Sequence, residues 1–142
     1  MRVKLSSAAI EAMFAAAAAA YPREACGLLL GEGAIITAAQ PTANVAPQPE
    51  THFEIDPAAL IAAHRVARSG AGRSSAPRLI GYFHSHPNGR AEPSPTDRAM
   101  AAHDAQIWAI ITPPSGAGAG ALALWRDAPS GFEPLSYDVV DG

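Results

Sequence analysis

The chain has 142 residues, of which 49% are hydrophobic and 16% are charged. This length suits one hydrophobic core, so we expect residues 1–142 to form a single domain. The net charge of −3 argues against nucleic acid as a partner, because no basic stripe is present to displace phosphate counterions. A lone cysteine, Cys26, excludes an intrachain disulfide and cysteine-based zinc fingers, and it indicates a reducing, cytoplasmic location.

The N-terminal region predicts an alanine-rich helix. Ser6 or Ser7 can cap this helix, which continues over residues 7–20 and ends before Pro22. We expect no signal peptide here, because Glu11 interrupts the apolar run and no clean cleavage site of small residues follows. We also expect no membrane partner, because no run reaches the roughly 18 strongly apolar residues of a membrane span.

Short apolar runs bounded by turn residues predict strands along the rest of the chain. The predicted strands cover residues 26–31, 34–39, 52–55, 79–84, 107–111, 121–126 and 132–140. A second helix is predicted to begin at Asp56-Pro57, and a third at Ser94-Pro95 that continues to about His103 or Asp104. The predicted loops are 69–77, 87–93 and 116–120. Helices and strands mixed without regular alternation favour an α+β fold.

Two histidines and an aspartate have the spacing of ligands to one metal ion. His84 and His86 lie two residues apart at the end of a predicted strand, where side chains two apart point to the same face. Asp97 lies across a loop, in the first turn of the next predicted helix, and can face them. Two imidazoles and one carboxylate form a common catalytic zinc set, which leaves a position open to water. We therefore predict that these three residues bind Zn²⁺.

A hydrolytic zinc site also needs a base and a donor to the developing oxyanion. Glu24 is our candidate base, because it precedes a buried strand where partial desolvation would move its pKa toward the working pH. Ser94 lies three residues before Asp97, and its hydroxyl is our candidate donor. Helix capping alone would also explain Ser94 and Asp97. Three further histidines are expected to be structural or exposed: His52, His64 and His103.

These residues resemble the JAMM (MPN+) metalloprotease motif, which is a distant Glu, then His-Ser/Thr-His, seven residues, Ser, two residues and Asp. Here the motif is made by Glu24, residues 84–86, Ser94 and Asp97, with residues 87–93 as the seven. No position of the motif is missing.

The resemblance extends beyond the motif itself. Residues 24–31 resemble the glutamate-bearing segment of the family, and Asn44 and residues 53–57 resemble its middle segment. In all, the resemblance covers residues 3–140, and the short length resembles the compact prokaryotic branch.

The resemblance implies a cytidine-deaminase-like α/β/α sandwich, with a mixed, mostly antiparallel sheet flanked by helices. It implies a zinc-dependent isopeptidase or peptidase that cleaves an amide bond at the C-terminal Gly-Gly tail of a ubiquitin-like or sulfur-carrier protein. In that family Glu24 would activate a zinc-bound water as general acid/base, and Ser94 would stabilise the tetrahedral intermediate. The alternative is a non-catalytic binding module of the same fold, which would need a broken ligand set.

Overall fold

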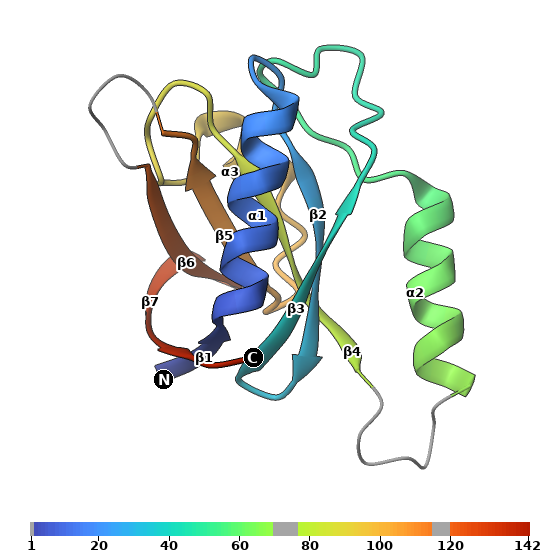
Figure 1. The fold of residues 1–142 in the computed structure, drawn as a ribbon. Coiled ribbons are helices and arrows are strands. Elements are labelled where there is room, and N and C mark those ends of the chain that lie inside the picture. Colours follow the sequence, from blue (N-terminus) through green and yellow to red (C-terminus); the bar gives the residue numbers. More distant parts are fainter. Residues whose placement is uncertain (1, 70–76, 115–119) are drawn as a thin grey trace.

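The computed structural model describes residues 2–69, 77–114 and 120–142 (Figure 1). Within these ranges the chain forms seven strands and three helices. In chain order they are β1 (Arg2–Ser6), α1 (Ser7–Ala20), β2 (Cys26–Glu32), β3 (Ile35–Thr42), α2 (Pro57–Ser69), β4 (Arg78–Ser85), α3 (Pro95–Met100), β5 (Ile107–Thr112), β6 (Ala121–Ala128) and β7 (Gly131–Val140).

The strands form one closed sheet in the order β1-β3-β2-β4-β5-β6-β7, with β7 pairing back to β1. Strand β1 runs parallel to both β3 and β7, and β4 runs parallel to β5. The other four neighbouring pairs are antiparallel. The predicted mixed, mostly antiparallel sheet is therefore confirmed, and among the described strands each one has a neighbour on both sides.

Alternating side chains on the central strands build a core on each face of the sheet. On one face, Phe83 of β4 and Ala109 of β5 pack in a cluster with Met13 of α1. Their neighbours in sequence, Tyr82 and Trp108, belong to a second cluster that includes residues of α2. Because consecutive strand residues point to opposite faces, the two helices cover different faces of the sheet (Figure 1). This arrangement agrees with the expected α+β layers.

The first helix forms as the sequence predicts. It covers Ser7–Ala20, and the Ser6 hydroxyl accepts a hydrogen bond from Ala9 N at 3.1 Å, which satisfies a free amide of the first turn. The second helix also begins at Pro57 as predicted, where Asp56 Oδ1 accepts from Ala58 N at 2.9 Å. In the described ranges no helix is both long and apolar enough to cross a membrane.

The structure differs from the predicted elements in three places. Residues 2–6 form a strand that we did not predict. Residues 52–55 form no strand and make only an isolated bridge between Ile55 and Asn44. The Asn44 side chain instead forms hydrogen bonds with their backbone: Nδ2 donates to the His52 carbonyl oxygen, and Oδ1 accepts from Glu54 N. Helix α3 ends at Met100 instead of continuing to His103 or Asp104, since His103 has a φ of 57° and its N–H donates to Asp127.

One of the three predicted loops lies wholly within the described residues. Residues 87–93 form a loop as predicted. Most of the predicted loops 69–77 and 116–120 lies outside the described residues.

Candidate metal centre

The pairing of β2 with β4 brings Glu24 beside the histidines. Cys26 pairs with His84 in the antiparallel register of these two strands. Just beyond that pair, Ala25 N donates to Ser85 Oγ at 2.8 Å, and Ser85 N donates to Ala25 O at 3.0 Å. Glu24, one residue earlier, is thereby fixed against the end of β4. A residue sixty positions from His84 in sequence thus becomes its neighbour.

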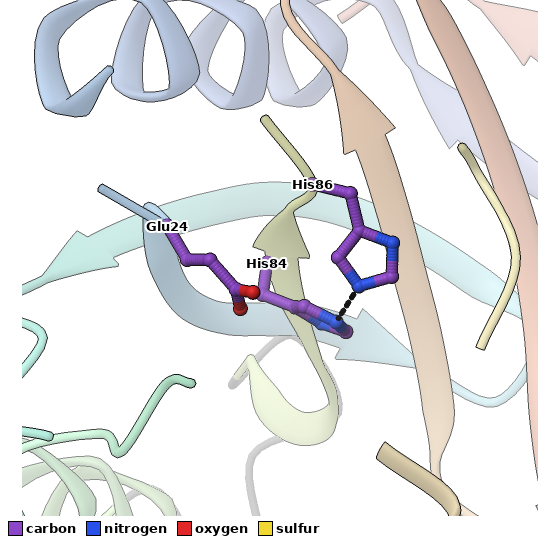
Figure 2. A group of neighbouring side chains, drawn as sticks. All are labelled: Glu24, His84 and His86. Carbon is purple, nitrogen blue, oxygen red and sulfur yellow. Dashed lines mark hydrogen bonds between the residues drawn. The ribbon is translucent and has the colours of Figure 1, made fainter. Parts of the chain in front are cut away.

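The three predicted metal ligands converge on one point. His84 Nε2 and His86 Nε2 lie 2.9 Å apart (Figure 2). Asp97 Oδ2 lies 3.1 Å from each of these two nitrogen atoms. All three side chains are buried, with exposures of 0%, 3% and 3% in chain order. The structure therefore brings together the end of β4 and the first turn of α3, as the sequence predicts.

The carboxylate of Glu24 points toward the two histidines (Figure 2). One ligand atom from each of Glu24, His84 and His86 lies within 4.8 Å of the other two. Glu24 is only 6% exposed, and its Oε1 has no hydrogen-bond partner. Burial raises the pKa of Glu24 to about 7; His86 opposes this rise and Asp97 adds to it. This carboxylate can gain or lose a proton near neutral pH.

The ligands carry opposing electrostatic effects. Burial lowers the pKa of His84 below its ordinary value, although Asp97 opposes this. Burial also acts to lower the pKa of His86, but hydrogen bonds to Asp97 and to the Arg90 carbonyl outweigh it, so that the pKa is raised. Burial acts to raise the pKa of Asp97, yet its bonds to both histidines and to the Ser94 amide hold that pKa well below its usual range. Asp97 is therefore an anion at neutral pH.

Ser94 and Asp97 combine helix capping with the site. Ser94 Oγ accepts from Asp97 N at 3.0 Å, and Ser94 N donates to Asp97 Oδ2 at 2.9 Å, so a complete capping box begins α3. Asp97 Oδ2 thus serves both the capping box, through Ser94 N, and the cluster, where it faces the two histidines. Because the Ser94 hydroxyl accepts through a lone pair, its own hydrogen remains available for donation. Capping and a role in the site are compatible for both residues.

Neighbouring groups fix the orientation of both imidazole rings. His86 Nδ1 lies 2.7 Å from the Arg90 carbonyl oxygen, so Nδ1 carries a hydrogen and donates it. The His84 ring stacks on Phe53 with centroids 4.2 Å apart, and Trp108 meets it edge-on at 5.6 Å. His84 Nδ1 is buried without a hydrogen-bond partner.

The donor set fits a divalent metal ion. With Nδ1 of His86 donating to Arg90, Nε2 of a neutral ring presents a lone pair. That lone pair faces Asp97 Oδ2, which also presents lone pairs, at 3.1 Å. A shared cation would satisfy both atoms, and the imidazole nitrogens and carboxylate oxygen are the donor types that zinc takes. Glu24 is the nearest additional acceptor.

A cleft of about 220 Å³ opens onto this group. Glu24, His86 and Ser94 line it together with Thr96 of α3 and four residues from two loops: Glu50, Thr51, Pro87 and Asn88. Sequence reasoning did not find Glu50 and Thr51, which no spacing rule connects to the motif. Their loop is held by Asn44, whose Nδ2 donates to the carbonyl oxygens of Glu24 and His52 at 3.0 Å each.

The remaining histidines lie outside the cluster, as expected. His64 is exposed on α2. His52 Nδ1 lies 2.7 Å from Thr51 Oγ1. His103 Nδ1 lies 3.2 Å from the Ala128 carbonyl oxygen and 3.4 Å from Asp127 Oδ1.

Comparison with known families decides the wider assignment. Residues 6–127 match the family described as prokaryotic homologs of the JAB domain. The chain belongs to the prokaryotic JAB family. The resemblance to the compact prokaryotic branch of JAMM proteins is thereby confirmed.

Two curated relatives contain a matching region. The JAB domain is 35% identical over 94 residues to the desampylase of Haloferax volcanii, covering 65% of this chain and 64% of that protein. It is 30% identical over 107 residues to tail tip assembly protein K of Escherichia phage N15, covering 75% of this chain and 40% of that protein. The chain therefore matches less than two thirds of the length of either relative.

Solved structures agree with the JAB fold. A protein from Desulfitobacterium hafniense is 26% identical with a TM-score of 0.82, covering 99% of this chain and 94% of that one. A JAB1/MPN domain protein from Archaeoglobus fulgidus is 19% identical with a TM-score of 0.64, covering 98% and 100%. A structure described as a JAMM metalloprotease-like zinc site in the proteasome and signalosome is 16% identical with a TM-score of 0.60, covering 99% and 100%.

Proposed function

We propose that this JAB domain is a zinc-dependent isopeptidase or peptidase acting at the C-terminal tail of a ubiquitin-like or sulfur-carrier protein. One observation carries the proposal. Three ligand atoms from His84, His86 and Asp97 lie 2.9 to 3.1 Å from one another, and the Glu24 carboxylate, whose Oε1 has no hydrogen-bond partner, points toward the two histidines. The match to a protein named desampylase supports the substrate class. The complete set of motif residues argues against a binding module without catalysis.

His84, His86 and Asp97 would hold the zinc ion. When bound, such an ion polarises the carbonyl under attack and lowers the pKa of a water molecule. Asp97 brings a fixed negative charge, because its pKa lies well below the usual range. His86 is oriented by Arg90 and His84 by its stack on Phe53. These contacts hold the ligand atoms in place before substrate arrives.

Glu24 would move the proton. It would take a proton from the attacking water and return it to the nitrogen of the leaving amine, so that the amide bond breaks to a carboxylate and an amine. Its buried carboxylate has a pKa of about 7, which suits both steps near neutral pH. The unpartnered Oε1 is free for this exchange, since no other described residue competes for it.

Ser94 would stabilise the oxygen on which negative charge develops. Its hydroxyl accepts from Asp97 N at 3.0 Å, which restricts the direction of the O–H group while leaving its hydrogen free. A hydroxyl oriented in advance costs little reorganisation as the charge forms. Ser94 also lines the cleft, where a thin Gly-Gly tail has room to enter.

The proposal is tested with Glu24→Gln and His86→Ala, assayed for zinc content and for cleavage of a Gly-Gly-tailed carrier fusion. Loss of the base should lower cleavage by a factor of about 100 or more while zinc remains bound. Loss of a ligand should remove both zinc and cleavage. Glu11→Gln, on the exposed side of α1, is the matched control and should match the parent protein. Full activity in Glu24→Gln, or no zinc binding by the parent chain, would overturn the proposal.

A further inference from the structure

Glu24 lies between two hollows, and the mechanism above uses only one of them. Beyond the cleft that contains His86 and Ser94, a second pocket of about 380 Å³ opens between the end of α1 and residues 41–44. Glu24 lines both. The walls of the second pocket are mainly small side chains: Ala16, Ala19, Ala20, Ala25 and Ala43. Short side chains leave room for an apolar group beside the candidate base.

Among the residues that the structure describes, Arg23 is the one basic side chain lining this alanine-walled pocket. It is exposed, and its guanidinium donates no hydrogen bond to any described residue and forms no ion pair with one. The other polar groups of the pocket are engaged. Asn44 Nδ2 donates to backbone carbonyls, and Thr42 Oγ1 contacts Cys26 at 3.5 Å. Besides Glu24, Arg23 alone offers the pocket an unused polar group.

The proton path fixes which part of a substrate each hollow receives. The carbonyl under attack must lie beside His86, Asp97 and Ser94, which places the acyl side in the first cleft. The leaving nitrogen must lie within reach of Glu24, which returns its proton. The chain that continues from this nitrogen then enters the pocket on the other side of Glu24.

We propose, on the basis of the function proposed above, that Arg23 binds the α-carboxylate of the leaving group. The leaving group is then a C-terminal amino acid with an apolar side chain, joined to the carrier tail through its α-amine. Hydrolysis breaks the amide C–N bond between the carrier tail and this amino acid, places the water oxygen on the acyl carbon and transfers a proton to the nitrogen. The planar guanidinium can bind a carboxylate through two parallel hydrogen bonds.

The end of α1 leaves this interaction possible. Carbonyl oxygens at a helix C-terminus disfavour anions, but here Ala17 O accepts from Tyr21 N and Ala20 O accepts from Arg23 N at 2.8 Å. A lysine within a protein chain has its α-carboxyl group in a peptide bond. A leaving group attached through such a lysine side chain would therefore offer Arg23 no α-carboxylate from that residue. The pocket therefore favours release of a single C-terminal residue over cleavage between two folded proteins.

A binding measurement tests the pocket independently of catalysis. L-valine and L-valinamide are titrated separately into the zinc-loaded full chain, and backbone amide shifts are followed by NMR at Ala16, Ala19 and Ala43. Valine should bind about 10- to 100-fold more tightly than valinamide, because only valine carries the carboxylate. Arg23→Gln should remove this difference, and Arg23→Lys should restore part of it. Arg65→Gln on α2 removes the same charge elsewhere and should bind like the parent.

Cleavage then separates this inference from the proposed function. Two carriers are compared, ending in Gly-Gly-Val with a free carboxylate or with a carboxamide. Arg23→Gln should lower kcat/KM about 10- to 100-fold for the first carrier only. Equal cleavage of both by the parent chain would overturn the role of Arg23 while leaving the peptidase intact. Equal valine and valinamide binding, or no shift at the pocket alanines, would overturn the pocket even if no carrier is cleaved.

Discussion

Glu24 and Asp97 are both buried carboxylates, yet their surroundings move their pKa values in opposite directions. Asp97 Oδ2 accepts from the Ser94 amide and faces two imidazole rings, which favours its charged form. Glu24 Oε1 has no partner, and burial favours its neutral form. Two neighbouring carboxylates with separated pKa values can take two different roles. At this scale, the geometry assigns Asp97 to charge and Glu24 to proton transfer.

The buried carboxylate of Glu24 predicts that the stability of the metal-free protein depends on pH. Its pKa rises from 4.5 to about 7 on folding, so ionisation costs stability as the pH rises through this interval and the loss is complete above it. Glu24→Gln removes this cost. The variant should exceed the parent in unfolding free energy by about 2 kcal/mol at pH 8 and by much less at pH 5.

Urea unfolding in the presence of a chelator measures both values. Glu11→Gln, which removes a carboxylate from the exposed side of α1, controls for the change in net charge. A gain from Glu24→Gln that is the same at pH 5 and pH 8 would show that burial of the charge is not its cause.

At the scale of elements, the sequence predicts what lies within one segment better than what lies between segments. Local rules predict the two-residue spacing of His84 and His86 and the capping of α3 by Ser94, and the structure agrees. The stack of Phe53 on His84 and the hydrogen bond from Ala25 N to Ser85 Oγ join distant segments, and no local sequence pattern predicts these contacts. Only the resemblance to the JAMM motif, and no local pattern, indicated that Glu24 lies near the histidines.

The close approach of β2 to its neighbours yields a prediction for Gly27. A Cβ atom there would lie 2.3 Å from a ring carbon of Phe83 and 2.3 Å from the Gln40 carbonyl oxygen. Gly27→Ala must therefore push β2 away from β4 or β3, and Glu24 lies two residues before β2 begins. The substitution should lower the unfolding free energy by about 1–3 kcal/mol and reduce cleavage as well.

Thermal unfolding and the cleavage assay test this pair of effects. Gly33→Asn is the matched control in the same hairpin, where φ is 60° and open space surrounds the position. Asn tolerates this left-handed conformation, so the control should stay close to the parent in both measurements. A fully active and fully stable Gly27→Ala protein would show that β2 shifts without moving Glu24.

At the scale of the whole molecule, closure of the sheet is the feature that the sequence did not reveal. Closure depends on β1, which pairs Leu5 with Val139 near the other end of the chain. Five residues at the N-terminus with one alternating pattern are too few to indicate a strand, and the partner lies 134 positions away. The α+β class and most of the individual strands and helices were predictable from apolar runs and helix caps, whereas the mixed, mostly antiparallel sheet was expected from the resemblance.

Closure and the metal centre lie on different parts of the sheet, so stability and activity should separate. Leu5 is fully buried in the core beneath α1, while His84 lies on β4, which β2 and β3 separate from β1. Leu5→Ala should lower the unfolding free energy by about 2–5 kcal/mol through the cavity it leaves. Its exposed neighbour provides the control, and Lys4→Ala should change stability by no more than about 0.5 kcal/mol. Below the unfolding transition, Leu5→Ala should retain its zinc content and cleavage rate, because the strands that hold the ligands keep their own partners. A folded Leu5→Ala protein that has lost zinc would instead mean that closure of the sheet sets the spacing of β2 and β4.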